Sequence, residues 1–145
     1  MATLSVAEME ALEICCRILG IQLSPEQEAA VTSILKQRDV FVSLPTGAGK
    51  SICYAILPLL FDTIKKTKGS IVIVTSPLLA LMKDQARIFN EKGIRTVYIE
   101  SDHGDANADE EVMQGEYQVV LFGPERILQS SKWRKMLLSS VYQEN

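Results

Sequence analysis

The sequence predicts an α/β domain with a mostly parallel sheet between two layers of helices. Short apolar runs alternate with helix-length segments along most of the chain. The runs at 70–75 (SIVIVT) and 117–122 (YQVVLF) have the continuous hydrophobicity of strands that are buried on both faces. A loop rich in proline and glycine, PTGAG, directly follows another apolar run. This alternation is typical of a three-layer sandwich built on a parallel sheet.

The first half of the chain predicts three helices and one strand. A capping box of the form Ser-x-x-Glu begins a helix over 5–19, and the glycine that follows ends it. A second box, Ser-x-x-Gln with proline in the first turn, begins a helix over 24–36. The apolar run at 39–44 (DVFVSL) predicts a strand, and 50–66 predicts a helix with a kink at Pro58.

The second half continues the alternation of strands and helices. Further strands are predicted at 70–75, 95–100 and 117–122, and further helices at 77–91, 107–114, 124–129 and 131–139. Trp133 lies at helical spacing with Met136 and Leu137, so we expect it to pack in the core. The four predicted strands are few for such a sheet, which indicates an incomplete domain.

Length and composition restrict the class of protein. The 145 residues fit one domain, and a hydrophobic content of 47% with 23% charged residues excludes wholesale disorder. Fifteen basic against eighteen acidic residues give a net charge of -3. This balance argues against a small basic protein that coats nucleic acid by charge alone, but it permits an enzyme with a local positive groove.

The N-terminus and the cysteines indicate a reducing compartment. The first residues, MATLSVAEMEALE, carry glutamates and no basic start, unlike a signal peptide. The longest apolar runs are shorter than the roughly 20 residues that a membrane span requires. Cys15, Cys16 and Cys53 suit neither a disulfide framework nor a zinc site. We therefore expect buried thiols, no membrane association, and a location in the nucleus or the cytoplasm.

The segment 43–51 (SLPTGAGKS) has the form of a phosphate-binding loop between a strand and a helix. Gly47 and Gly49 can adopt dihedral angles closed to other residues, so that successive N–H groups turn inward around an anion. Lys50 would reach the β- and γ-phosphates of a nucleotide, and the Ser51 hydroxyl would bind Mg²⁺. The candidate ATP-binding residues of the loop are Thr46, Gly47, Ala48, Gly49, Lys50 and Ser51. The alternative is an ordinary strand-to-helix turn with a solvated lysine.

Four segments in sequence order resemble the RecQ family of superfamily 2 DNA helicases. The first, LSPEQEAAV, resembles the motif whose glutamine recognises adenine, and the second, LPTGAGKSICY, resembles motif I. TSPLLALMKDQ resembles motif Ia, and PER resembles motif Ib. The resemblance implies a P-loop NTPase fold of the RecA-like type and an ATP-dependent 3′–5′ DNA helicase that acts in DNA repair and recombination. It also implies ATP and Mg²⁺ as cofactors and single-stranded DNA or DNA junctions as partners.

The resemblance assigns roles to individual residues. Gln27 would recognise adenine through its primary amide, whereas the alternative is that the amide only completes the capping box. Lys50 would be the catalytic lysine and Ser51 the metal ligand. The residues that would grip the sugar-phosphate chain of DNA are Ser76, Pro77, Leu78, Pro124, Glu125 and Arg126. The leucines of motif Ia, at 78, 79 and 81, are expected in the core under either interpretation.

The resemblance also implies a domain organisation. Residues 1–22 would form an N-terminal helix, and 23–145 would form a partial ATP-binding domain that ends before the Asp-Glu box. Such a chain is expected to bind ATP and magnesium without completing hydrolysis or unwinding. The strand at 39–44 would keep an exposed apolar edge, so that the chain would be marginally stable unless the rest of the helicase or a protein partner covered it.

Two other functions, and one other metal site, are alternatives to a helicase fragment with a nucleotide-bound magnesium ion. The chain could be a catalytically inactive nucleotide- or DNA-binding isoform with a regulatory or partner-binding role. A complete small P-loop enzyme, such as a nucleotide kinase, is disfavoured because the arginines form no evident cluster. The acidic segment ESDH at 100–103, which contains the single histidine His103, imitates a magnesium motif but is expected to be a solvated loop.

Overall fold

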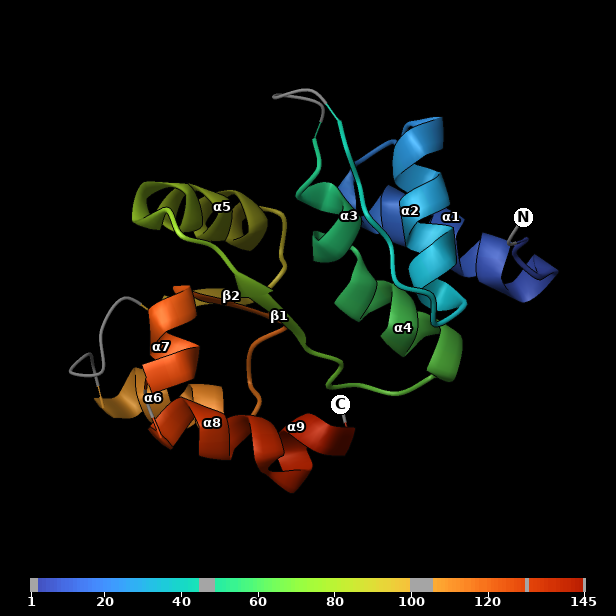
Figure 1. The fold of residues 1–145 in the computed structure, drawn as a ribbon. Coiled ribbons are helices and arrows are strands. Elements are labelled where there is room, and N and C mark those ends of the chain that lie inside the picture. Colours follow the sequence, from blue (N-terminus) through green and yellow to red (C-terminus); the bar gives the residue numbers. More distant parts are fainter. Residues whose placement is uncertain (1–2, 45–48, 100–105, 130, 145) are drawn as a thin grey trace. The chain divides into compact units, whose positions relative to one another are not determined.

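A computed structural model describes residues 3–44, 49–99, 106–129 and 131–144. The chain divides into two compact units, Met1–Lys68 and Gly69–Asn145, and each is described by itself (Figure 1).

The N-terminal unit contains four helices in its described part: α1 (Val6–Leu19), α2 (Pro25–Leu35), α3 (Ile52–Ala55) and α4 (Leu57–Lys65). Both predicted capping boxes are confirmed, with Ser5 and Ser24 as the N-caps. Gly20 ends α1 in the left-handed conformation, at φ 66°. The predicted kink is also confirmed, because α3 and α4 are separate helices and Pro58 lies in the first turn of α4.

The core of the N-terminal unit forms where α1 packs against α4 and α2 packs against α3. Cys15 on α1 is fully buried, and its Sγ lies 3.6 Å from the Thr63 hydroxyl of α4. Burial raises the pKa of the Cys15 thiol, which keeps it protonated. Cys53 is buried as expected, whereas Cys16 is half-buried. All three thiols are free.

The predicted strand at 39–44 is wrong. This segment forms neither a strand nor a helix, and the Phe41 side chain in its middle is 93% exposed. An apolar run becomes a strand only when a neighbouring strand satisfies its N–H and C=O groups. The run at 39–44 has no such neighbour among the described residues, and its Val40 and Phe41 side chains are exposed.

One ion pair in this unit predicts a pH dependence of its stability. Lys36 donates a hydrogen bond of 2.8 Å to the Glu8 carboxylate, which also accepts the Ser5 N–H at 2.8 Å. These bonds, the one from Lys36 above all, lower the pKa of Glu8 in the folded state. A lowered pKa adds stability above the ordinary glutamate range, near pH ~4.3, and this stability disappears as the pH falls through the folded value.

We therefore expect Glu8→Gln to lower the urea midpoint at pH 7 and to have little effect at pH 3. The matched control is Glu10→Gln, on the exposed surface of the same helix. An equal loss at both pH values would show that the carboxylate charge is not the cause.

The C-terminal unit is built on a parallel sheet of three strands in its described part. The strands are β1 (Val72–Thr75), β2 (Thr96–Ile99) and β3 (Val119–Phe122), in the order β1-β3-β2. The helices are α5 (Leu79–Glu91), α6 (Ala106–Met113), α7 (Pro124–Gln129), α8 (Ser131–Leu138) and α9 (Ser140–Glu144). All four residues of the central strand β3 are buried, as its apolar run predicts.

The strand order places helices on both faces of this sheet. The connection from β1 to β2 passes the position of β3, and the connection from β2 returns to it. Because such connections are right-handed, the two crossover helices lie on opposite faces. Figure 1 shows α5 on one face of the sheet and α6, α7 and α8 on the other. The predicted three-layer arrangement is therefore present around these strands.

A hydrophobic core of this unit forms between the strands β2 and β3 and the helices α6 and α8. Trp133 is fully buried there, and its ring meets the ring of Phe122 edge-on, with centroids 5.3 Å apart. The expectation that Trp133 is a packing residue is confirmed. Tyr142 of α9 donates a hydrogen bond to the Val112 carbonyl of α6, and burial raises the pKa of this tyrosine to about 12.

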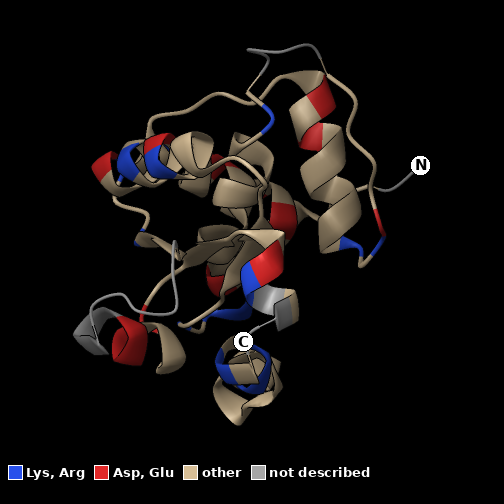
Figure 2. Cartoon of the chain, turned by 60° about the vertical axis from the view of Figure 1, so that its left-hand side comes forward, with Lys and Arg blue, Asp and Glu red and all other residues tan. Residues whose placement is uncertain are grey.

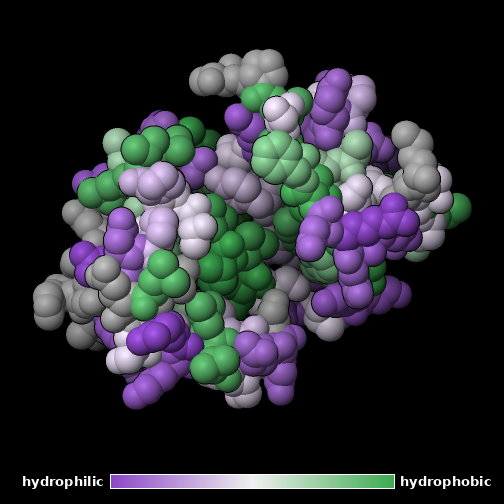
Figure 3. All heavy atoms as spheres, viewed as in Figure 1, coloured by the Kyte–Doolittle hydropathy of each residue, from purple (hydrophilic) through white to green (hydrophobic). Residues whose placement is uncertain are grey.

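The leucines of motif Ia are not core residues, contrary to expectation. Leu78 is 60% exposed, and Leu79 and Leu81 are also exposed. The buried stripe of α5 is instead Met82, Ala86 and Phe89, which recur at helical spacing. Hydrophobic side chains accordingly lie on the surface over α5 (Figure 3). No helix in the described ranges is long and apolar enough to cross a membrane.

Candidate nucleotide and nucleic-acid sites

The described part of the phosphate loop begins at Gly49. Thr46, Gly47 and Ala48 lie outside the described residues. Gly49 has φ +75°, in the left-handed region where residues with a side chain are strained. The exposed Lys50 follows in a turn, and Ser51 is the N-cap residue of α3.

Gln27 is hydrogen-bonded to the C-terminal end of this loop. Its side chain is buried, and its Nε2 donates a hydrogen bond of 3.0 Å to the Gly49 carbonyl. Its Oε1 accepts the Ser24 N–H at 2.8 Å, so the capping-box alternative is confirmed. One amide therefore fixes the start of α2 and the end of the phosphate loop together. Contact between Gln27 and adenine stays a prediction.

The described end of the loop, from Gly49 to Ser51, carries groups of the kind that bind phosphate and magnesium. A Cβ atom placed on Gly49 would lie 2.8 Å from Gln27 Nε2, so a side chain at this position would require the Gln27 amide to shift. Neither the Lys50 nor the Ser51 N–H donates to a backbone carbonyl of the described residues. The Ser51 hydroxyl makes no capping hydrogen bond. These donors, the lysine ammonium and the serine hydroxyl are the groups that phosphate and magnesium require.

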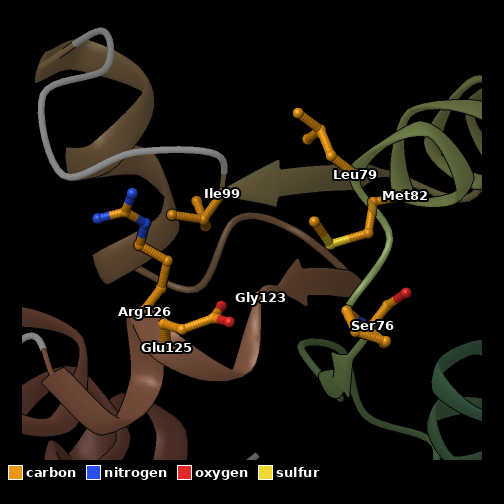
Figure 4. A pocket seen from close by; sticks show the side chains of 8 residues that line it. Ser76, Leu79, Met82, Ile99, Gly123, Glu125 and Arg126 are labelled. Atoms are coloured by element: carbon orange, nitrogen blue, oxygen red, sulfur yellow. The ribbon is translucent and has the colours of Figure 1, made fainter.

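A second site lies in the C-terminal unit, at the carboxyl ends of its strands. Ser76 follows β1, Ile99 ends β2 and Gly123 follows β3, and together they border a cavity of about 350 Å³ (Figure 4). In open α/β sheets, ligands bind in the crevice at this edge. Ser76 is buried, and its N–H donates to the Phe122 carbonyl at 2.9 Å. Its hydroxyl accepts the Leu78 N–H at 3.4 Å.

The structure brings together most of the residues predicted to grip DNA. Ser76, Pro77, Glu125 and Arg126 line this cavity. Leu78 and Pro124 are not among its lining residues: Leu78 lies on the surface before α5, and Pro124 begins α7. Sequence reasoning missed the remaining lining residues, which are Leu79, Met82, Ile99 and Gly123. Leu79 and Met82 lie in the segment that resembles motif Ia, and Gly123 directly precedes the PER segment, whereas Ile99 could be found only from the strand order.

Charge does not gather on the outer surface of α5. Basic and acidic residues are interspersed along this helix (Figure 2). Arg87 donates to Asp84 at 2.9 Å and to Glu91 at 3.1 Å, and these bonds raise the pKa of Arg87. The face of α5 therefore carries no basic stripe.

Within the part of the chain that the structure describes, no group of three or more His, Cys, Asp and Glu side chains could hold an ion. The acidic segment at 100–103, with His103, lies outside the described residues.

Comparison with known families agrees with the fold. The model of the DEAD/DEAH box helicases matches residues 24–142. The chain belongs to this family, and its architecture is an incomplete P-loop NTPase fold of the RecA-like type.

Its relatives place it more narrowly, among the RecQ helicases. The chain is 28% identical to the ATP-dependent DNA helicase RecQ of Haemophilus influenzae over 90% of its length and 21% of that protein. It is 35% identical to the RecQ of Bacillus subtilis, over 70% of the chain and 17% of that protein. It is also 35% identical to the ATP-dependent helicase SGS1 of Saccharomyces cerevisiae, over 81% of the chain and 8% of that protein. The chain thus spans about a fifth or less of each of these relatives.

Proposed function

We propose that this chain is the ATP-binding portion of a RecQ-like 3′–5′ DNA helicase, which binds ATP with Mg²⁺ and contacts single-stranded DNA. The observation that carries the proposal is the hydrogen bond from Gln27 to the Gly49 carbonyl. It joins the segment that resembles the adenine-recognition motif to the phosphate loop across 22 positions of sequence. In this proposal residues 23–145 are the partial ATP-binding domain, preceded by an N-terminal segment, 1–22, that contains α1.

Each group in the nucleotide site has a distinct role. The N–H groups of the loop 46–51 surround the phosphates, and the Lys50 ammonium neutralises the charge of the β- and γ-phosphates. The Ser51 hydroxyl would hold Mg²⁺, which would supply positive charge to stabilise the phosphates. Gln27 recognises adenine while its amide also positions Gly49.

The DNA site uses the two segments that border the cavity of the C-terminal unit. Ser76, Pro77 and Leu78 hold the sugar-phosphate chain on one side, and Pro124, Glu125 and Arg126 lie on the other. Contacts of this kind position the strand without reading its sequence.

The 145 residues by themselves bind ATP without turning it over. Hydrolysis requires charge stabilisation at the γ-phosphate from several sides, including an acidic box that orients magnesium and water. No Asp-Glu pair follows the PER motif in these residues. The exposed apolar segment at 39–44 is where the rest of a helicase or a protein partner would cover the chain.

Titration with a fluorescent ATP analogue tests the proposal. Lys50→Ala is expected to weaken binding at least tenfold, because a charge-assisted hydrogen bond contributes about 1.5–3 kcal/mol. The matched control, Lys68→Ala, removes an exposed lysine outside the loop and should leave the affinity unchanged. Equal affinity of wild type and Lys50→Ala would remove the ATP assignment.

A further inference from the structure

The cavity of the C-terminal unit has walls that suit a nucleobase as well as a phosphate chain. The apolar side chains among its lining residues are those of Pro77, Leu79, Met82 and Ile99, and the polar ones are those of Ser76, Glu125 and Arg126. A volume of about 350 Å³ is at the lower end of the range for small-ligand sites and is sufficient for one base. Proteins that read an unstacked base place it between apolar side chains and contact its hydrogen-bonding edge.

Glu125 is the side chain that could read such an edge. Figure 4 shows its carboxylate directed into the cavity and the Arg126 guanidinium directed the other way. A Cβ atom on Gly123 would lie 3.3 Å from Glu125 Oε2, so the carboxylate lies close over Gly123, where no side chain occupies the space. An ionised carboxylate only accepts hydrogen bonds, and it accepts two parallel donors best.

We propose that this cavity receives one base of the bound single strand and that Glu125 selects guanine. Guanine alone presents two adjacent donors, N1–H and the N2 amino group, on its Watson–Crick edge. Adenine and cytosine place a ring-nitrogen acceptor beside their amino group, and thymine places carbonyls on both sides of its N3–H. Each of these would direct a lone pair at the carboxylate. The inference rests on the proposed DNA contact and adds a base preference to it.

Fluorescence anisotropy with labelled 15-mers tests the preference in the full chain. The probes are oligo(dT) and the same strand with one central dG, dI, dA or dC. We expect the dG strand to bind about three- to tenfold more tightly than oligo(dT), the contribution of one or two hydrogen bonds in an open, hydrated cavity. Inosine, which lacks the N2 amino group, should lie between them.

Two variants distinguish the hydrogen bonds of the Glu125 carboxylate from a general effect of removing one negative charge. Glu125→Gln should abolish the ratio between dG and dT, because an amide offers one donor and one acceptor in place of two acceptors. Glu125 is exposed, so this variant should fold. Glu116→Gln removes an equal charge from another exposed position of the same unit and should keep the ratio.

The outcomes distinguish this inference from the proposed function. Equal binding of all strands by the wild type, or a dG preference that survives Glu125→Gln, overturns the base selection while DNA binding stands. Failure to bind any strand overturns the proposed DNA contact, and the base selection with it.

Discussion

Replacing Gly49 with alanine is expected to weaken nucleotide binding by about 100-fold, the equivalent of about 2.7 kcal/mol. Two separate effects contribute. Alanine at φ +75° is strained by roughly 1–2 kcal/mol. The new methyl group would also lie 2.8 Å from Gln27 Nε2, well inside van der Waals contact. Relief of that contact requires the loop or the glutamine to move, and either movement disturbs the geometry in which the loop meets phosphate.

The glutamine cannot move without loss, because both ends of its amide are bonded. Its Oε1 accepts the Ser24 N–H at 2.8 Å, and its Nε2 donates to the Gly49 carbonyl at 3.0 Å. Displacing it breaks a helix cap and a loop contact together, each of which contributes about 1 kcal/mol.

A double-mutant cycle separates the two effects. Gln27→Ala alone should weaken nucleotide binding, because the loop loses its hydrogen bond from Gln27 to the Gly49 carbonyl. In combination with Gly49→Ala it should weaken binding less than the sum of the two changes, since the steric contact is gone and only the dihedral strain remains. Strict additivity would contradict the steric account. Gly20→Ala, also at positive φ but outside the loop, controls for a general loss of stability.

The features that sequence reasoning predicted correctly are those encoded over a few residues. Each capping box consists of two side chains three positions apart, and each bonds the backbone of the same turn. The break before Pro58 follows from the missing N–H and the ring of that residue. The strands at 72–75, 96–99 and 119–122 were predicted from short apolar runs, although among these three only 119–122 has all four residues buried.

The features that sequence reasoning missed depend on distant partners. The run at 39–44 is as apolar as a buried strand, but the described chain supplies no neighbour for it, and Phe41 remains in solvent. The leucines of motif Ia are hydrophobic, yet α5 turns its Met82 side to the sheet. The contact between Gln27 and Gly49 spans 22 positions, and no local pattern encodes it. Only the resemblance of the two segments to a known family placed them in one site.

Trp133→Ala is expected to lower the free energy of unfolding of the C-terminal unit by about 3–5 kcal/mol. The indole is fully buried, and it packs with Val112, Phe122 and Met136 in one cluster. Truncation would remove the hydrophobic contribution of the indole and leave a cavity that the surrounding strand and helices fill only in part. Because single domains are stable by only about 5–15 kcal/mol, such a loss leaves the unit near its unfolding threshold.

The same substitution should also weaken DNA binding, because Trp133 packs against Phe122, the residue that ends β3 just before the cavity. Trp133 packs edge-on against Phe122, whose carbonyl accepts the Ser76 N–H at 2.9 Å and whose neighbour Gly123 precedes α7. Urea denaturation followed by far-UV circular dichroism measures the stability, and anisotropy with oligo(dT) measures the binding. Trp133→Phe, which keeps an aromatic ring, should recover part of both losses. Leu138→Ala, at a position 77% exposed on the same helix, should change neither by more than about 0.5 kcal/mol. A Trp133→Ala protein as stable as the wild type would show that this cluster does not hold the strand ends together.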